Sequence, residues 1–475
     1  MEFVHRFEGM IGWRRVLLVL VVGWGCGLAH AVNRAPNIVL IMADDIGWEC
    51  LGCYGGESTP TPHIDRLAAS GIRFDHAHAQ PICTPSRVQI MTGIYNNRNY
   101  IKFGLLDPEA VTFAQVLKSR GYKTCVAGKW QLKGGLKGPR KFGFDRYCLW
   151  QLTRRPSRYP NPGLEIDGRE VDFKNGEYGP DIVSDYVLRF IEENKTGPFF
   201  VYYPMILTHW PFVATPDSPD WDPTMWRDKK YEPGGYYNPK YWPGMVAYED
   251  KLVGRLVAKL ESLGIRENTL VIWTGDNGTY TNIVSKFRGR KYRGGKGSTK
   301  DNGTHVGFIA SWPAVIQPGR TSDSLVDFTD VFPTLAEVAG ARIPESLHLD
   351  GVSLAPVFHG KSRKKDAIYC WYSRDGTREN ASQHVRDQRY KLYATGKFFD
   401  TVADPDERNN LARNGIPKSL RAKYASLRRI LEARMAVTRA ADPVQKAKRA
   451  RVRSGGRLLP PKPRGAKFNR ARPRP

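Results

Sequence analysis

Cysteine is too scarce in this chain for a fold held together by disulfide bonds. The 475 residues include seven cysteines, and Cys26 lies in an N-terminal segment that we expect to be removed. Domains built on disulfides are far richer in cysteine. Cys50 and Cys53 form one C-x-x-C pair with no second pair to complete a zinc site, so we interpret the pair as structural.

Long apolar runs are absent after residue 31. The early run, 16–22, follows Arg14 and Arg15 and precedes Ala29-His30-Ala31, which fits a small-x-small cleavage site. This order is typical of a secretory signal peptide, here residues 1–31. Since no later stretch is long and apolar enough to span a membrane, the sequence predicts an exported protein without a transmembrane segment after signal removal.

Acidic residues are absent from the end of the chain, 446–475, which contains twelve Lys and Arg among many Pro and Gly. This composition predicts a disordered basic tail. In a chain of net charge +26, such a tail can attract a polyanionic glycan or an anionic envelope; a solvated tail with no specific partner is the alternative. Nucleic acid is disfavoured as a partner, because no binding module is recognisable and the chain carries an export signal.

Short apolar runs at 37–43, 122–127, 198–204 and 269–274 predict buried parallel strands. Helical patterns lie between them, at 112–120, 181–193 and 247–263. Alternating strands and helices predict an α/β fold with a large doubly wound sheet flanked by helices.

Three further segments follow from the pattern along the chain. Residues 32–343 form the predicted α/β domain, and short β-like segments followed by a helix over 417–437 predict a small C-terminal α+β domain at 344–445. An insertion rich in aromatic residues occupies 210–245. Its rings either stack on sugar rings or pack the loop onto the body of the protein.

Polar residues follow each of the four predicted strands. Asp44 and Asp45 follow the first, Lys129 the second, His209 the third, and Asp276-Asn277 the fourth. In open α/β sheets ligands bind outside the carboxyl ends of the strands, so we expect these side chains to converge.

The two carboxylate pairs predict a calcium site, because calcium prefers several oxygen ligands. Cys83 stands just before a helical pattern, 86–91, whose N-terminus favours an anion. Around it, Arg87 can donate two hydrogen bonds to an oxyanion, and Lys129 and Lys296 supply point charges. His209 is a candidate acid for protonating a leaving alcohol.

Cys83-Thr84-Pro85-Ser86-Arg87 resembles the signature around the active-site cysteine of the type I sulfatases. Other segments are similar to motifs of that family and follow in its order; they are 37–45, 128–130, 209–211, 275–278, 295–297 and 399–411. The resemblance covers about 36–440 and implies the fold of the alkaline phosphatase superfamily, with a large mixed sheet.

The resemblance also implies the chemistry. A formylglycine-generating enzyme oxidises Cys83 to formylglycine, whose hydrated form attacks the sulfur of a sulfate ester. Calcium lies at Asp44, Asp45, Asp276 and Asn277, with modified Cys83 as a further ligand. Arg87, Lys129, His209 and Lys296 surround the sulfate, and His209 protonates the departing hydroxyl.

Two positions depart from the family pattern. Gln131 stands where the family has a histidine that contacts the diol, and Gln cannot act as a base. Asp301-Asn302-Gly303-Thr304-His305 replaces a Glu-Gly-Gly-x-Arg pattern. His305 either compensates for the missing base or packs near the strand that follows.

Asn277 and Asn302 begin N-glycosylation sequons. A glycan on the calcium ligand Asn277 would destroy the site, which favours a bacterial host and a periplasmic or extracellular location.

The sequence therefore predicts a sulfatase acting on a sulfated carbohydrate. One alternative is a phosphodiesterase or phosphonate hydrolase of the same superfamily. Another is a homologue that binds sulfated glycan without turnover, which the substitution at Gln131 motivates.

Overall fold

A large mixed sheet forms the centre of the computed structural model, which describes residues 35–222, 224 and 238–453. The strands of this sheet are β1 (Asn37–Ala43), β2 (Ile72–His78), β3 (Lys123–Lys129), β4 (Arg146–Trp150), β5 (Gly163–Ile166), β6 (Arg169–Asp172), β7 (Phe199–Pro204), β8 (Thr269–Gly275), β11 (Phe308–Ser311) and β12 (Arg320–Asp327). The strand order is β12-β2-β11-β8-β1-β7-β3-β4-β5-β6. The central strands β8, β1, β7 and β3 are parallel, whereas β11 runs antiparallel to both of its neighbours.

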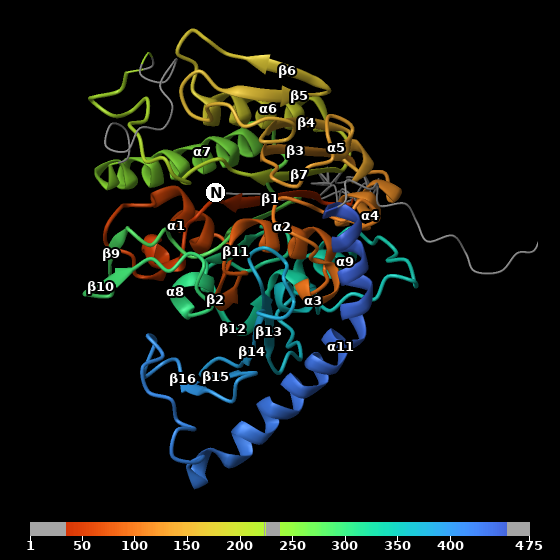
Figure 1. Ribbon diagram of the computed structural model, residues 1–475. Helices are drawn as coiled ribbons and strands as arrows, with labels where there is room; N and C mark the ends of the chain where they lie inside the picture. The colour runs from red at the N-terminus through yellow and green to blue at the C-terminus, as the bar shows by residue number, and fades with distance from the viewer. Residues whose placement is uncertain (1–34, 223, 225–237, 454–475) are drawn as a thin grey trace, which may run out of the picture. The chain divides into compact units, whose positions relative to one another are not determined.

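Helices cover both faces of this sheet. The helices of the large domain are α1 (Pro62–Ala69), α2 (Cys83–Thr92), α3 (Asn96–Asn99), α4 (Phe113–Ser119), α5 (Gly138–Lys141), α6 (Gly179–Glu193), α7 (Trp242–Ser262), α8 (Asp301–Thr304), α9 (Val331–Val338) and α10 (Ala355–Phe358). Figure 1 shows α6 and α7 on one side of the central strands and α2 and α9 on the other.

The sequence of β1 explains the two layers. Side chains along a strand alternate between the faces of the sheet. Leu40 and its neighbours at every second position pack with α2, α4 and α9, whereas Ile41 and its set pack with α1, α6 and α7. Because both faces are covered, β1 is apolar throughout, and its bounds match the predicted strand 37–43. The predicted doubly wound α/β fold is therefore confirmed.

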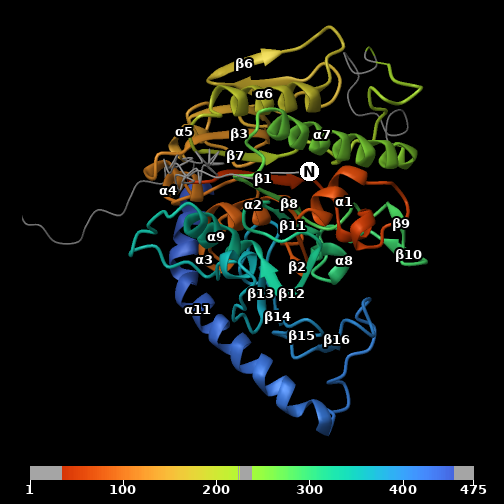
Figure 2. The same ribbon diagram turned by 180° about the vertical axis from the view of Figure 1, so that it is seen from behind.

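The C-terminal part adds a small antiparallel sheet. Its strands are β13 (Ile368–Tyr372), β14 (Ser382–Arg386), β15 (Tyr390–Tyr393) and β16 (Phe398–Asp400), and a long helix, α11 (Arg421–Arg453), follows. Figures 1 and 2 both show α11 running along this sheet. A short hairpin, β9 (Val284–Phe287) with β10 (Arg290–Arg293), belongs to the large domain.

The last helix corrects a predicted boundary. We expected a helix over 417–437 and a disordered tail from 446, but α11 continues to Arg453. Acidic side chains of the body explain the difference, because Lys446 pairs with Glu379 at 2.8 Å, and Lys448 and Arg449 pair with Asp107 and Asp375. Residues 454–475 lie outside the described residues.

Other predicted segments are described in part. The expected signal peptide, 1–31, lies outside the described residues, as do 223 and 225–237 of the aromatic insertion. In the described part of the insertion, Trp242 is buried and packs edge-on against Phe212, and Trp221 packs against Tyr178. None of the helices within 35–222 and 238–453 combines the length and hydropathy of a membrane span.

Buried ion pairs join the small sheet to the loop that carries Lys296. Arg386 of β14 donates to Asp301 at 2.6 Å, and Lys391 of β15 contacts the same oxygen at 3.1 Å. Burial would raise the pKa of Asp301, but the charges of Arg386 and Lys391 lower it well below its usual range. The loop from Lys296 to α8 is therefore held by the C-terminal part.

Replacing Arg386 with methionine should destabilise the protein by about 3–5 kcal/mol, because a buried charge on Asp301 loses a partner. Arg389→Met is the matched control, since the Arg389 side chain is 57% exposed and its pair with Asp400 lies near solvent. Urea unfolding measures both, and equal midpoints for the two variants would contradict the role of Arg386.

Candidate active site

The four predicted oxygen ligands meet at the adjoining ends of β1 and β8. Asp44, Asp45, Asp276 and Asn277 are fully buried. The backbone N–H of Asp45 donates to Oδ1 of Asp276 at 3.0 Å, and Nδ2 of Asn277 donates to Oδ1 of Asp45 at 2.9 Å. Register explains the contact, because β1 and β8 are parallel and Ala43 lies opposite Gly275.

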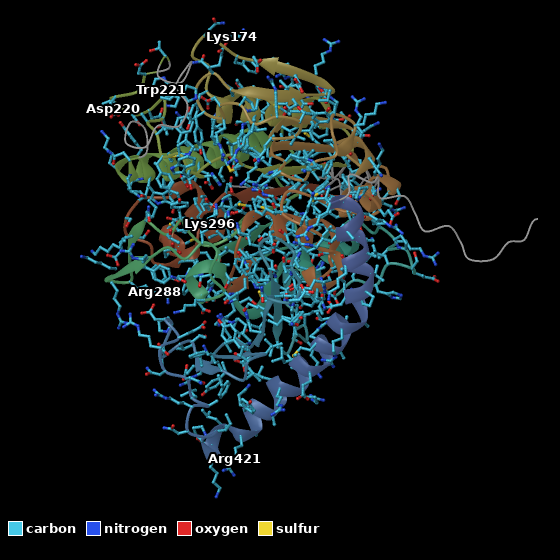
Figure 3. The ribbon with its side chains drawn as sticks, viewed as in Figure 1. Lys174, Asp220, Trp221, Arg288, Lys296 and Arg421 are labelled. Carbon is cyan, nitrogen blue, oxygen red and sulfur yellow. The ribbon has the colours of Figure 1, made fainter. Side chains whose placement is uncertain are left out.

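Three cationic side chains contact these carboxylates. Lys129, the last residue of β3, donates to both oxygens of Asp44 at 2.8 and 2.7 Å. Lys296 donates to Asp45 at 2.6 Å, and Arg87 of α2 donates to Asp276 at 2.9 Å. The Lys296 side chain is 11% exposed, and Figure 3 shows Lys174 and Arg421 at the outer edges of the protein. Charge is thus balanced locally in a space with little water.

Cys83 lies at the start of α2, facing this cluster. Its side chain is 1% exposed, and Sγ lies 4.0 Å from Oδ1 of Asp45. The helix begins at Cys83 itself rather than at Ser86 as the helical pattern indicated. Burial raises the pKa of the Cys83 thiol to about 12, so the unmodified side chain is a protonated thiol at neutral pH.

The carboxylates differ in charge. Burial alone would raise the pKa of Asp44, but the nearby Lys129, His209 and Arg87 lower it well below its usual range. Burial and the charge of Asp44 raise the pKa of Asp276 to about 7. A site with this much negative charge at neighbouring positions favours a bound cation.

The carboxylate and amide oxygens of the site fit a hard divalent cation, and a thiol and an imidazole lie beside them. Asp44, Asp45, Cys83 and His209 each offer one ligand atom, and these atoms lie within 4.8 Å of one another. Oδ1 of Asn277 is buried and accepts no hydrogen bond among the described residues. A buried amide oxygen beside three carboxylates suits calcium, which binds oxygen ligands of both kinds.

His209 joins the cluster from the segment beyond the end of β7. Its Nε2 is 3.8 Å from Oδ2 of Asp45, and Nδ1 is 2.6 Å from the carbonyl oxygen of Trp210. Burial, with the charges of Lys296 and Lys129, lowers the pKa of His209 well below its usual range. The imidazole is therefore neutral until a negative charge approaches it.

Gln131 and His305 lie in different surroundings. Oε1 of Gln131 accepts from Thr84 at 3.3 Å, so Gln131 lies beside the residue that follows Cys83. His305 stacks on Trp48, with ring centroids 3.7 Å apart, and its Nε2 is 3.0 Å from the carbonyl oxygen of Asp75. The structure thus brings Gln131 to the site and gives His305 partners elsewhere.

Arg158 is the charged residue that sequence reasoning missed. It lies in the loop between β4 and β5, 2% exposed, with Nη1 3.9 Å from Oδ2 of Asp44. Its place after a strand next to β3 could have marked Arg158 as a site residue. Three other arginines, at 154, 155 and 169, lie around the same segment. Nothing in the spacing distinguishes Arg158 from them.

Comparison with known proteins matches this arrangement. The profile of the family Sulfatase matches residues 36–341, and that of the C-terminal part of N-sulphoglucosamine sulphohydrolase matches 296–436. Human arylsulfatase A is 32% identical over 437 residues, which cover 82% of this chain and 80% of that protein. N-acetylgalactosamine-6-sulfatase of Canis lupus familiaris is 31% identical over 385 residues, with 74% and 70% covered.

A solved structure agrees. The crystal structure of Ps i-CgsB superimposes on this chain with a TM-score of 0.70 at 28% identity. The match covers 84% of this chain and 92% of the Ps i-CgsB chain. Ps i-CgsB was also solved in complex with k-i-k-neocarrahexaose. The family profile covers most of the described residues, including every predicted ligand and cation of the site. The chain therefore belongs to the sulfatases, a family of sulfuric ester hydrolases within the alkaline phosphatase superfamily.

Proposed function

We propose that this protein hydrolyses sulfate esters of a sulfated carbohydrate through a formylglycine formed from Cys83 and a bound calcium ion. The proposal rests on one observation: the buried side chain of Cys83 lies beside three carboxylates and three cationic side chains. A sulfate ester placed there contacts positive side chains and lies beside residue 83, as in-line attack requires.

The surroundings of Cys83 support a modified side chain. A thiol whose pKa is about 12 is a poor nucleophile at neutral pH. Converted to formylglycine, residue 83 supplies a hydrated aldehyde oxygen as the nucleophile. We therefore propose a formylglycine-generating enzyme as a partner during maturation, and export to the periplasm or the cell exterior.

Calcium binding is proposed for Asp44, Asp45, Asp276 and Asn277, together with residue 83. When bound, the ion supplies positive charge that neutralises the carboxylates and stabilises negative oxygens of the sulfate. With Asp44 and Asp45 neutralised in this way, Lys129 and Lys296 have hydrogen-bond donors available for a sulfate.

His209 is placed to protonate the leaving alcohol. The free imidazole is neutral, but the negative charge of a bound sulfate ester raises its pKa and so favours its protonated form. Its Nδ1 faces the carbonyl oxygen of Trp210, which fixes the ring and leaves Nε2 toward the cluster. Protonation matters most when the leaving group is a sugar hydroxyl, because an alkoxide leaves poorly.

A carbohydrate is the favoured substrate class for two reasons. The relative named N-acetylgalactosamine-6-sulfatase and the complex of Ps i-CgsB with an oligosaccharide share most of the length of this chain. The aromatic insertion also follows directly on His209. A second candidate is a homologue that binds sulfated glycan without turnover, which Gln131 favours because an amide cannot accept a proton.

Mass spectrometry of the peptide containing Cys83, from protein made in its native host, should show the mass of formylglycine. Cys83→Ala should then abolish sulfate release from a panel of defined sulfated oligosaccharides. Cys53→Ala is the control, because Cys53 lies on the surface side of the C-x-x-C pair. A fully unmodified thiol in active protein would disprove the proposed nucleophile. Confirmed conversion with tight glycan binding and no desulfation would favour the binding homologue.

Removing calcium should abolish activity, and adding it back should restore activity. Asn277→Ala should weaken calcium binding by about tenfold or more, because it deletes a buried oxygen that accepts no hydrogen bond from any described residue. Calorimetric titration of the metal-free protein measures the affinity. Asn302→Ala controls for loss of an amide nearby, and equal affinities in the two variants would exclude Asn277 as a ligand.

His209→Ala should slow hydrolysis of a sugar sulfate by about 10²–10⁴-fold, the usual contribution of a positioned acid. The same variant should lose much less on 4-nitrophenyl sulfate, whose phenolate leaves without a proton. The ratio of the two kcat/KM values measures the effect, and an equal loss on both substrates would show that His209 does not protonate the leaving group.

A further inference from the structure

We propose that Arg158 is a further residue that binds the sulfate group of the substrate, donating hydrogen bonds to its oxygens from beside Oδ2 of Asp44. The inference rests on the proposed function, since it assigns a residue to the same site.

Two of the three guanidinium nitrogens of Arg158 are buried without a hydrogen-bond acceptor in the part of the chain that the structure describes. The side chain is 2% exposed, and neither Nε nor Nη1 has a partner among the described residues. The ring of Trp150 lies 3.7 Å from Cζ, and Oδ2 of Asp44 lies 3.9 Å from Nη1, too far for a hydrogen bond. Burying a charged donor without an acceptor is costly, so an anion at this place would satisfy it.

The loop around Arg158 is anchored beside the site. The hydroxyl of Tyr159 donates to the carbonyl oxygen of His209 at 2.5 Å, and the N–H of Gly179 donates to the carbonyl of Tyr159 at 2.8 Å. Nε1 of Trp150 donates to the carbonyl of Pro156 at 3.0 Å. Tyr159 is thus bonded to the segment that carries His209 and to the start of α6, and Pro156 is bonded to the end of β4, so the backbone on either side of Arg158 is held in place.

The charge pattern distinguishes Arg158 from the other cations. Arg87, Lys129 and Lys296 each donate to a carboxylate at 2.9 Å or less, whereas the carboxylate contact of Arg158 among the described residues is the longer one with Asp44. Arg158 therefore has donor atoms in reserve that face the cluster. A planar guanidinium also suits an oxyanion with two adjacent oxygens.

Gln131 gives a reason for the additional charge. Gln131 extends from the end of β3, and its backbone N–H donates to the carbonyl of Gln151, beyond the end of β4. The family resemblance implies a histidine that can carry a proton at this position, and this chain has a neutral amide there. Arg158, from the loop that begins at Gln151, supplies a permanent positive charge to the same end of the sheet.

The test uses inorganic sulfate, the reaction product, and calcium-loaded protein. Calorimetry measures the affinity for sulfate, and inhibition kinetics measure sulfate as a competitive inhibitor. Arg158→Met should weaken sulfate binding and lower kcat/KM by about 10- to 100-fold, the usual effect of losing hydrogen bonds from a charged donor. Arg155→Met is the matched control, because Arg155 belongs to the same loop and is exposed; it should stay within about twofold of wild type.

Arg158→Lys separates loss of sulfate binding from misfolding, because lysine keeps the positive charge but lacks the planar guanidinium. It should weaken sulfate binding several-fold while the thermal melt stays at the wild-type temperature. Sulfate affinities equal to wild type in both Arg158 variants would overturn the proposal. A loss of sulfate affinity that is fully explained by a loss of calcium affinity would also overturn the proposal, because Arg158 would then only position Asp44.

Failure of the proposed function gives a different result. If the wild type releases no sulfate from any ester but binds sulfate in a manner that depends on Arg158, the enzyme assignment fails and the anion site stands. If the wild type is active and the Arg158 variants match it in both measurements, the assignment stands and Arg158 is excluded.

Discussion

The structure depends on the burial of opposite charges at the ends of β1 and β8. Three carboxylates with no exposed surface, Asp44, Asp45 and Asp276, lie within contact of Arg87, Lys129 and Lys296. Removing each ion from water costs several kcal/mol, so the arrangement persists only because the surrounding elements hold every partner in place. The same constraint underlies both proposed ligands, because a cation would neutralise the carboxylates and leave donors of the cationic side chains for an anion.

Topology brings these groups together from distant parts of the sequence. The order β8-β1-β7-β3 places four carboxyl ends side by side, and each end carries a residue of the site: Asp276, Asp44, His209 beyond β7, and Lys129. This part could be predicted from the sequence, because buried parallel strands are continuous apolar runs and their polar ends stand out. Lys129 shows the limit of the approach, since β3 extends two residues beyond the predicted 127.

Features that depend on tertiary contacts could not be predicted in the same way. The antiparallel strand β11 lies between β2 and β8, and its four residues carry no signal of orientation. The length of α11 depends on acidic partners at Asp107, Asp375 and Glu379, which lie far away in sequence. Arg158 is similar, because its burial follows from stacking on Trp150 and from the anchored loop, not from any local motif.

In the proposed reaction, neither Gln131 nor His305 is suited to act as the base that releases sulfate. Gln131 accepts a hydrogen bond from Thr84 and cannot take up a proton. Burial lowers the pKa of His305 to about 3, and its ring is stacked on Trp48 and directed at the carbonyl of Asp75. A base so weak and so engaged favours the packing interpretation of His305.

The carboxylate that lies next to Cys83 is Asp45, 4.0 Å away. Each of its oxygens already accepts one hydrogen bond, from Asn277 or from Lys296. In the proposed reaction, a proton that leaves residue 83 therefore has two groups within reach: this engaged carboxylate, and the neutral imidazole of His209, whose nitrogen lies within 4.8 Å of Sγ.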